Sequence, residues 1–540
     1  MAKMNPGKMT LEDFSLPGTV PAEDLYFQGA ITKNDIELDS LKPIKPKRDN
    51  DADEEGKDAA LPSNYGIWNN WVNNTSLHGI RYVFWRRPLW ARIGWLLLLL
   101  AFTAYFLFTA YKSLDKYFKR PINTVITQKY VNSLEFPAVT ICPQNLISKK
   151  KMYALDGDAD FVRYSLNDSF CSATKSVRGD KPCGAAMVCC CLPFFLFDGG
   201  NIVPNCTTPY LAALIAAQYT SGTFFDTIKF YEKYSPGVEE MLKSGLCVFD
   251  GRIDKLCGVS DFSSSVTDWG VCHTFNAGLG GPDSIRKAKF TGAGGGLNIL
   301  LTAQIDDNTI GRLSEGFSVI IHRQGDHFLP WDGINVGPGM QATITLHQQR
   351  LKNLEDPYET KCEDKKLKAF SSYTLKGCIY ECLAEHIMES CKCRTAGYSA
   401  ETSLKTCAKL DQPCVVNVTA NLNVSVCDCT VPCNEIRYTT EVHYSKFPDA
   451  GSAAALQADG ITYLPFEYLR KNSVFLRIGY KTLSYELLEQ NVAFGVEALF
   501  GEIGGNMGLF LGCSLMTIFE FADLLVALVF VRSLHKEYQT

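Results

Sequence analysis

Two acidic residues, Glu520 and Asp523, lie within a long apolar stretch that covers residues 504–531. A charged side chain at the centre of a lipid bilayer costs roughly 2.5 to 3.5 kcal/mol on insertion scales, so it is rarely left facing lipid. The i and i+3 spacing places both carboxylates on one face of a helix. Small residues precede them, in the sequence Gly512-Cys513-Ser514. This combination is typical of a membrane segment that lines a water-filled ion path.

A second apolar stretch is expected to cross the membrane. Residues 93–111 carry no charged side chain and reach the roughly 20 residues that a spanning helix needs. The stretch follows a long, mostly polar segment and is not followed by a small-residue cleavage site, so it does not resemble a signal peptide. Between residues 111 and 501, no other run approaches the length of a span. We therefore expect two spans, at 92–111 and 501–531, on either side of one large loop.

The cysteines indicate that this loop, residues 112–500, is extracellular. Of the 21 cysteines, 20 lie between the two spans and only Cys513 lies within one. Such a distribution is typical of a disulfide framework in an oxidising compartment, and it disfavours zinc binding, which is the alternative for closely spaced cysteines. Both termini are then cytosolic. Four glycosylation sequons agree with this orientation, at Asn167, Asn205, Asn417 and Asn423.

The other segments are predicted from composition and hydrophobic pattern. Residues 1–62 are rich in charge and proline and are expected to be a disordered cytosolic N-terminus. Residues 24–29 resemble a protease-tag recognition sequence, so residues 1–30 are set aside as partly tag-derived. Residues 63–91 form an aromatic and basic cytosolic segment, and residues 532–540 a short cytosolic C-terminus. Strand-like runs and one helical pattern, at residues 374–390, predict an α+β extracellular domain.

Six separated motifs occur in order along the chain. They are the pair His78-Gly79, residues 136–142, 269–278 and 338–341, the cysteine array of residues 362–433, and residues 501–514. Together they resemble the degenerin/epithelial sodium channel family, which also contains acid-sensing and peptide-gated channels. The resemblance implies a membrane protein with a hand-like extracellular domain of palm, thumb, finger and knuckle. It also implies a homotrimer, or a heterotrimer with related subunits.

The resemblance also implies a set of disulfide bonds, whereas spacing alone leaves many pairings open for the ten cysteines of residues 362–433. Five bonds would form a ladder in the thumb, at about residues 358–433, and two would lie elsewhere. The implied pairs are Cys362–Cys433, Cys378–Cys429, Cys382–Cys427, Cys391–Cys414, Cys393–Cys407, Cys142–Cys272 and Cys247–Cys257. Six further cysteines fall in the finger, at about residues 150–245, and could form three more bonds: Cys171, Cys183, Cys189, Cys190, Cys191 and Cys206.

By the same resemblance, Gly512, Cys513 and Ser514 match the selectivity filter of the family. In a trimer, Glu520 and Asp523 would form acidic rings below this filter. Backbone carbonyls and rings of acidic side chains are the groups that channels use to replace ion hydration and attract cations.

The resemblance also implies roles in gating and at the pore mouth for other positions. Glu502 would form an acidic ring at the outer mouth, beside Gly501, where a bulky side chain holds relatives open. His78 and Gly79 match the cytosolic motif that shapes the lower pore. Tyr358 stands where an aromatic residue couples the thumb to the first span.

The expected function is a sodium-selective, amiloride-sensitive channel of the plasma membrane. We expect an extracellular ligand, with a neuropeptide favoured, and no cofactor or resident metal; sodium permeates and calcium is expected to block at the pore mouth. An acid-sensing channel or a constitutive leak channel is the alternative within the family. Weak or no acid activation is expected, because residues 414–426 of the thumb contain no carboxylate and residues 119–123 lack the expected histidine.

Other classes of protein account for fewer of these residues. An ATP-gated trimeric channel would need clustered lysines for phosphate, and a non-conducting receptor would leave Glu520 and Asp523 unexplained. No nucleophile with a base, no metal pair and no cofactor loop can be named, so an enzyme is not expected. No basic patch with interleaved aromatic residues predicts nucleic-acid binding.

Overall fold

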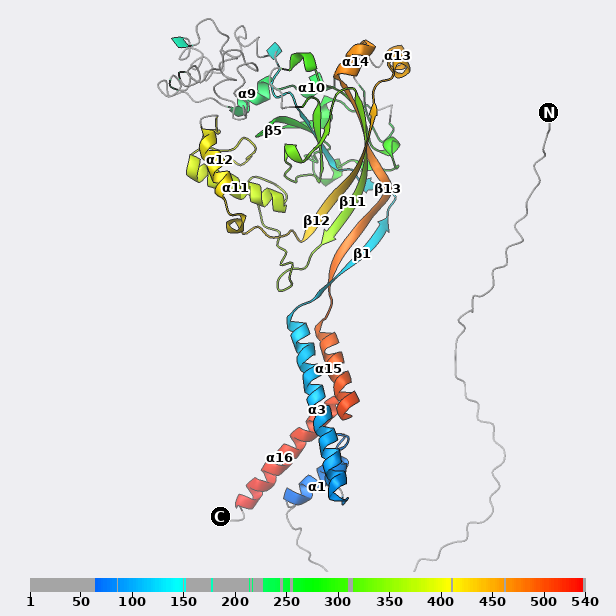
Figure 1. The fold of residues 1–540 in the computed structure, drawn as a ribbon, viewed down its shortest axis with the longest axis vertical. Helices are drawn as coiled ribbons and strands as arrows, with labels where there is room; N and C mark the ends of the chain where they lie inside the picture. The colour runs from blue at the N-terminus through cyan, green and yellow to red at the C-terminus, as the bar shows by residue number, and fades with distance from the viewer. Residues whose placement is uncertain are drawn as a thin grey trace, which may run out of the picture. The chain divides into compact units, whose positions relative to one another are not determined.

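The fold is seen in a computed structural model of the chain (Figure 1). The structure describes residues 64–84, 86–148, 150–151, 176–177, 213, 216, 227–242, 246–252, 256–308, 314–408, 411–460 and 463–537. The predictions for the N-terminal tail, for the six finger cysteines and for the sequons at Asn167 and Asn205 lie outside these residues. The chain divides into two units, and the elements that position the site belong to the unit Trp68–Ala527.

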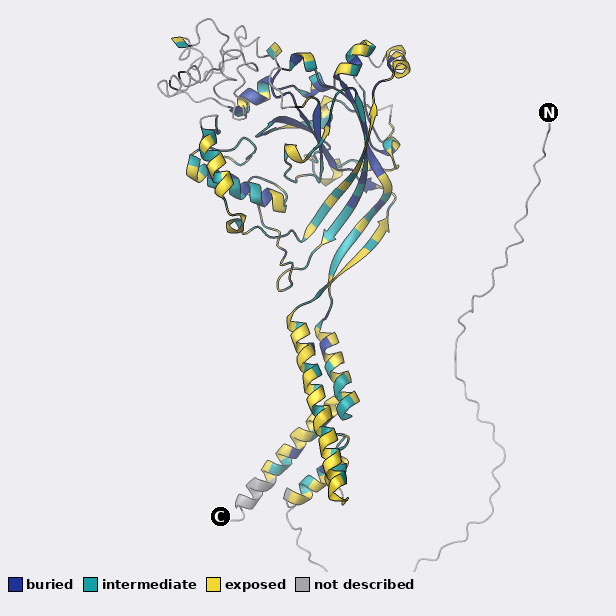
Figure 2. Cartoon of the chain, viewed as in Figure 1, coloured by how far each residue is buried: buried dark blue, intermediate teal, exposed yellow. Residues whose placement is uncertain are grey.

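Three helices form the first membrane-proximal part of the chain: α1 (Asn64–Asn74), α2 (Ile80–Phe84) and α3 (Leu89–Phe118). Among the described residues, α3 is the one unbroken helix that is long and apolar enough to cross a membrane. It contains the span expected at 92–111. Figure 2 shows α3 exposed along most of its length, and none of its most apolar stretch is buried within the chain. A helix that is apolar and unburied over this length is suited to lipid.

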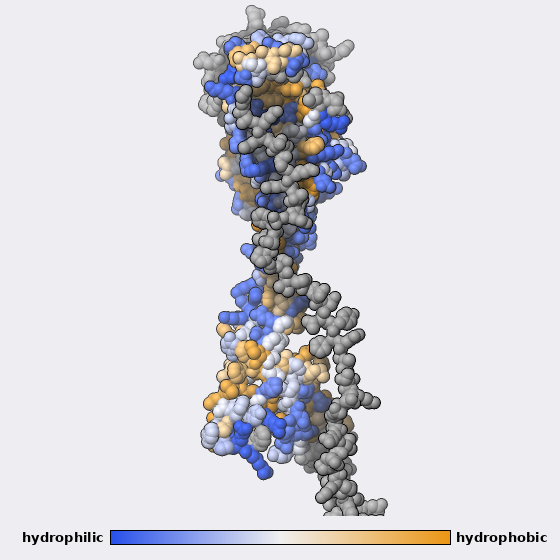
Figure 3. Space-filling model, turned by 90° about the vertical axis from the view of Figure 1, so that its right-hand side faces the viewer, coloured by the Kyte–Doolittle hydropathy of each residue, from blue (hydrophilic) through white to orange (hydrophobic). Residues whose placement is uncertain are grey.

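The second apolar stretch consists of two helices, α15 (Val496–Leu511) and α16 (Leu515–Glu537). They satisfy the length and composition of a span only as a pair, and they are bent by 70° at the break between them. The first of them begins five residues before the expected boundary at residue 501, after Gly495 in extended conformation. Aromatic contacts join α15 to α3: the ring of Phe510 lies 4.8 Å from that of Tyr105. Figure 3 shows apolar side chains gathered on these helices.

One large sheet connects both membrane segments to the extracellular domain. Its strands follow the order β12-β11-β13-β8-β4, and β1 pairs with the lower part of β13. The strands are β1 (Ile122–Tyr130), β4 (Cys247–Phe249), β8 (Leu297–Thr302), β11 (Met340–Lys352), β12 (Asn434–Lys446) and β13 (Ser473–Val492). β1 follows α3 and β13 precedes α15, and the two strands pair from Ile122 with Val492 to Tyr130 with Ser484. Movement of this sheet is therefore transmitted to both helices together.

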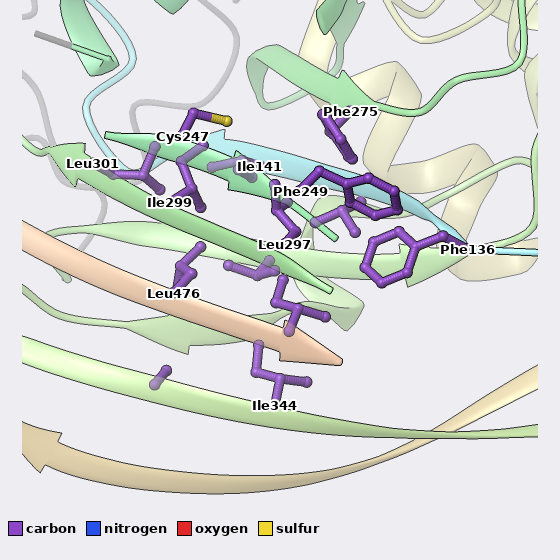
Figure 4. Packing of buried hydrophobic residues seen from close by; sticks show 14 of the residues in the cluster. Phe136, Ile141, Cys247, Phe249, Phe275, Leu297, Ile299, Leu301, Ile344 and Leu476 are labelled. Carbon is purple, nitrogen blue, oxygen red and sulfur yellow. The ribbon is translucent and has the colours of Figure 1, made fainter. Parts of the chain in front are cut away.

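A second sheet has the order β10-β9-β3-β6-β5. Its strands are β3 (Ala138–Pro143), β5 (Phe262–Thr267), β6 (Gly270–Phe275), β9 (Phe317–His322) and β10 (Ile334–Val336), and β2 (Leu134–Glu135) pairs with β7 (Lys287–Ala288) beside it. All six residues of β3 and of β6 are buried, as in strands that are covered on both faces. The main core lies between the two sheets, where Phe136, Ile141 and Phe275 approach Leu297, Ile344 and Leu476 (Figure 4).

Helices cover the remaining faces of the domain. The expected helix at residues 374–390 is α11 (Leu375–Cys391), whose first turn is capped by the Thr374 hydroxyl, which accepts from Gly377 N. The other helices are α9 (Thr227–Tyr234), α10 (Val238–Met241), α12 (Gln412–Asn421), α13 (Ala450–Ala458) and α14 (Phe466–Asn472). Short 3-10 turns join these elements, at Val259–Asp261, Pro282–Ser284, Ala293–Gly295, Ile305–Asp307, Pro330–Asp332 and Val424–Cys427.

Among the described residues of the extracellular domain there are seven disulfide bonds, and they join the same pairs that the family resemblance implies. Five of them form a ladder within residues 362–433, where two bonds tie α11 to the segment before β12 and a third ties the end of α11 to α12. The bonded pairs are Cys142–Cys272, Cys247–Cys257, Cys362–Cys433, Cys378–Cys429, Cys382–Cys427, Cys391–Cys414 and Cys393–Cys407. Among the described residues, Cys513 is the free cysteine.

The contribution of the core between the two sheets to stability can be tested at Phe136. Its side chain is 0% exposed and its ring contacts those of Phe249 and Tyr480, at 5.1 and 6.2 Å between centroids. Phe136→Ala should lower the free energy of unfolding by about 3–5 kcal/mol, the range for aromatic-to-alanine changes in cores. Thermal melting of the purified protein and its surface expression would measure the loss. Leu279→Ala is the control, because Leu279 is 84% exposed; equal melting temperatures for the two variants would contradict this account of the core.

Candidate functional site

The break between α15 and α16 has an unusual backbone. Gly512 adopts the left-handed conformation, with φ +63°, and its amide donates to the carbonyl of Gly508 at 3.0 Å. A left-handed glycine is a common end of a helix, because the missing Cβ removes the steric penalty. The next helix then begins from a side-chain cap, since the Ser514 amide donates to Thr517 Oγ1 at 3.0 Å. Residues 512–514 are thus held outside both helices, with Ser514 exposed.

The segment of residues 75–79, between α1 and α2, packs directly against this break. The His78 amide donates to the carbonyl of Leu511 at 3.2 Å. A Cβ added to Gly512 would lie 1.6 Å from His78 Nδ1, which is far inside contact distance. The structure therefore brings together the two short motifs singled out by the sequence, and the ring of His78 occupies the space that a side chain at Gly512 would need.

Glu520 holds the same segment from below. Its Oε2 accepts hydrogen bonds from Thr75 Oγ1 at 2.7 Å and from the Ser76 amide at 2.9 Å. The Ser76 hydroxyl in turn lies 2.5 Å from the hydroxyl of Thr517, one turn before Glu520. Hydrogen bonds to an ionised carboxylate are roughly twice as strong as those between neutral groups. Within one chain, Glu520 is therefore a half-buried anchor for residues 75–76 rather than a bare carboxylate.

Trp71 adds an aromatic contact to this anchor. Its indole nitrogen donates to the backbone carbonyl of Glu520 at 3.1 Å, and its ring lies 4.7 Å from that of Phe521. Sequence reasoning missed Trp71, Thr75, Ser76 and Thr517. The signal that could have suggested them is the pair of hydroxyl residues Thr75 and Ser76, just before His78. A carboxylate within a membrane needs hydrogen-bond donors, and hydroxyl groups can supply them.

The second predicted carboxylate has a different environment. Asp523 is exposed and makes no hydrogen bond or ion pair with any described residue. Both acidic residues of α16 are near the break, yet only one is engaged within the chain. Asp523 therefore differs from Glu520 in having a carboxylate that no described residue engages.

The predicted residues of the outer mouth lie in α15. Gly501 and Glu502 are both exposed, and no atom lies within 4 Å of a Cβ built on Gly501. A larger side chain would fit here in a single chain, so any obstruction at this position must come from another chain.

Tyr358 lies before the first cysteine of the disulfide ladder and meets the chain just after α3 ends. Its ring centroid is 6.0 Å from the guanidinium of Arg120, two residues after α3 ends. This is at the outer limit of a cation–π contact. A second tie is close by, because Thr360 Oγ1 and the Leu354 amide both donate to Gln490 Oε1 on β13, at 2.6 and 3.0 Å. Residues 354–360 are thereby in contact with the end of α3 and with β13.

Comparison with known proteins decides the family. The family model described as amiloride-sensitive sodium channel matches residues 71–524. The chain belongs to this family. The match begins at Trp71 and ends after Asp523, so it includes the packed break, the anchoring carboxylate and the whole extracellular domain.

Curated members of the amiloride-sensitive sodium channel family resemble the chain over most of its length. Acid-sensing ion channel 2 of Rattus norvegicus is 29% identical, over 85% of this chain and 86% of the relative. Acid-sensing ion channel 1 of Gallus gallus is 28% identical, over 87% and 85%. The bile acid-sensitive ion channel of Homo sapiens is 28% identical, over 84% of each. The chain is thus a sodium channel of this family, with a disulfide-rich and strand-rich extracellular domain, and not an enzyme.

The contact between Thr75 and Glu520 can be tested by a double-mutant cycle. Thr75→Val removes the hydroxyl donor and Glu520→Gln removes the charge, so each should lower the sodium current per surface channel. Each loss of current is converted to a free energy from the ratio of variant to natural current. Because both changes break one interaction, the free-energy loss of the double variant should be smaller than the sum of the two single losses by about 1–2 kcal/mol, as in other directly bonded pairs. Whole-cell current divided by surface protein, measured by biotinylation, gives the three values.

Asp523→Asn is the matched control for this cycle. Asp523 does not contact Thr75, so its effect on current should add to that of Thr75→Val within about 0.5 kcal/mol. Additive effects of Thr75→Val and Glu520→Gln would contradict the assignment of Glu520 as the anchor of residues 75–76.

Proposed function

We propose that three copies of the chain form a sodium-selective, amiloride-sensitive channel of the plasma membrane, opened by an extracellular neuropeptide. The copies are identical or related subunits, and both termini of each are cytosolic. The observation that carries this proposal is the unwound backbone at residues 512–514, which is covered by residues 75–79 from the opposite end of the chain. In this assignment the large sheet is the palm, α11 and α12 belong to the thumb, and residues 150–245 are the finger.

Assembly around a common axis is supported by the surface of α15. No atom lies within 4 Å of a Cβ built on Gly501, Gly504 or Gly505, so this part of the helix presents bare backbone. Small residues let helices approach closely in a membrane. Three copies of α15 then surround one path, which a single chain has no means to enclose.

The path is expected to act on ions at three levels. Glu502 forms an outer acidic ring, where calcium competes with sodium. The backbone of Gly512 to Ser514 replaces part of the hydration shell of sodium, as carbonyl groups do in other filters. Below it, Asp523 and Glu520 concentrate cations, and Glu520 also positions residues 75–79. No resident metal or cofactor is required.

We expect a motion of the thumb to open the channel, and we expect it to reach the membrane helices through the base of the thumb. The five disulfides of the ladder stiffen the thumb, and the contact between Tyr358 and Arg120 lies where it meets α3. Motion of a stiff thumb is thus delivered to β1, β13 and the two helices that follow or precede them. A peptide is the favoured agonist because residues 414–426, which include most of α12, carry no carboxylate to pair with another acid in a proton sensor.

Expression in a cell that lacks related channels tests the proposal directly. Application of amidated peptides should open sodium currents that amiloride blocks, with little current carried by larger cations. Ser514→Ala should change the sodium-to-potassium permeability ratio, because it alters the exposed end of the break. Surface-expressed protein that stays silent under peptides, acid and calcium removal would refute the proposal of a ligand-opened channel.

Gating by protons is a second candidate, and Asp326 favours it. This half-buried residue follows β9 and accepts a hydrogen bond from Ser372 Oγ at 2.7 Å, just before α11 of the thumb. Burial raises the pKa of Asp326 to about 6, with the bond from Ser372 and the charge of Arg323 opposing the rise. Burial likewise raises the pKa of Asp268, which accepts from Tyr380 Oη of α11 at 2.5 Å. Both carboxylates lie between the second sheet and the thumb, outside the stretch on which the expectation of weak acid activation rests.

The direction of this pH effect follows from linkage. The pKa of Asp326 when the thumb is docked, about 6, is above the ordinary value of 3.8. Docking is therefore stabilised by proton uptake, fully at low pH, and the stabilisation is lost as pH rises through about 6. Half-buried His327, which lies between the rings of Phe370 and Tyr380 at 4.3 and 4.4 Å, has its pKa lowered to about 4 by burial and stays neutral above pH 5.

Asp326→Asn should remove the pH dependence of thumb docking between pH 7 and 5. Hydrogen exchange of the α11 amides at several pH values would measure docking: in the natural protein protection should rise as pH falls through about 6, and in the variant it should stay constant. Asp283→Asn is the control, since Asp283 is exposed and has no partner among the described residues. Equal pH dependence in both variants would show that Asp326 is not the source of the pH dependence of docking. Currents that stay constant from pH 7 to 5 would exclude protons as the agonist.

A further inference from the structure

A cavity of about 540 Å³ opens at the end of the thumb, away from the ion path. Its lining comes from one short stretch: Arg394, Ser399, Ala400, Glu401, Thr402 and Ser403. The Cys393–Cys407 disulfide closes this stretch into a loop. Backbone bonds reinforce the closure, since the Arg394 amide donates to Lys405 O at 2.9 Å and the Cys407 amide to Arg394 O at 2.8 Å. The lining of this cavity, which is widely open to solvent, is therefore held by one disulfide and two backbone hydrogen bonds.

Arg394 contributes a positive charge that no described residue compensates. It forms no ion pair with the described residues, and its Nε is a buried donor without a hydrogen-bond partner among them. Its guanidinium has one long hydrogen bond, from Nη1 to Tyr398 O at 3.4 Å. By contrast, nearby Lys405 is paired with both oxygens of Asp411, at 3.0 and 3.1 Å. A guanidinium with spare donors is suited to a carboxylate, which it can bind through two parallel hydrogen bonds.

Glu401 places the opposite charge on the same cavity. It is exposed, and within the described part of the chain it has neither a hydrogen bond nor an ion pair, with Arg394 or with any other group. Two opposite charges thus line one cavity without neutralising each other. A ligand that fits both must carry a carboxylate and a cation on a short frame.

We propose that this cavity binds a short peptide with both termini free, the C-terminal carboxylate against Arg394 and the N-terminal ammonium against Glu401. Thr402 and Ser403 add hydroxyl groups that can bond the peptide backbone. An amidated peptide lacks the carboxylate, so this site differs in ligand chemistry from the agonist site proposed above.

Binding can be measured without any current. The purified full-length channel is melted at increasing concentrations of triglycine, triglycine amide and N-acetyl-triglycine, which differ only in their end groups. A ligand of the folded state raises the melting temperature in proportion to the logarithm of its concentration above Kd. Triglycine should give a shift that grows in this logarithmic way, and each blocked form should bind at least tenfold more weakly. Arg394→Gln should abolish the preference for the free acid over the amide, and Glu401→Gln the preference for the free amine over the acetylated form.

Lys392→Gln is the matched control, because it removes one positive charge next to the loop but outside the cavity lining. It should leave the shifts unchanged. Arg394→Lys keeps the positive charge but removes the guanidinium that can form two parallel hydrogen bonds. It provides a second variant if Arg394→Gln melts at a much lower temperature. Equal shifts from triglycine and its amide in the natural protein, or no shift at all, would overturn the proposal. These outcomes are independent of whether the channel conducts.

Discussion

The missing side chain at Gly512 is the constraint on which the inner half of the membrane segment depends. The residue must adopt a left-handed conformation to end α15, which non-glycine residues adopt at a cost of roughly 1–2 kcal/mol. It must also leave room for His78, whose ring occupies the space of a Cβ. Once His78 is in place, the residues before it are brought to Thr517 and Glu520, whose side chains supply their hydrogen-bonding partners. A single substitution would disturb both the break and the segment that covers it.

The extracellular domain is linked to this break through paired strands rather than through flexible loops. β1 and β13 pair along nine residues each and lead directly to α3 and α15. The Ala493 amide also donates to Pro121 O at 3.0 Å where the strands meet the helices. A hydrogen-bonded ladder resists sliding, so this pairing fixes the register of the two strands where they meet α3 and α15. The contacts of Tyr358 and Gln490 show where residues 354–360 meet this part of the chain.

Sequence reasoning succeeded where the signal is local or carried by family motifs. The length and uniform apolarity of residues 93–111 predict α3, and the periodicity of residues 374–390 predicts α11. The seven disulfide pairs came from the resemblance, since spacing left the pairing open. The role of Glu520 could not be predicted, because its donor Thr75 lies 445 residues away in the chain. Likewise, the raised pKa of Asp326 depends on burial against the segment before α11, and no local sequence pattern around the residue predicts this burial.

The two carboxylates of α16 illustrate how one chain can place acidic groups near a shared axis. In the proposed trimer, three copies of Glu520 and three of Asp523 would repel one another if all were bare. Each Glu520 is instead stabilised as an anion by two donors from its own chain, Thr75 Oγ1 and the Ser76 amide. These bonds spread its charge over residues 75–76 and tie it to the wall. Asp523 has no such partner among the described residues. One copy of the chain therefore satisfies only the first of its two acidic groups, so any partner that neutralises Asp523 must come from outside these residues.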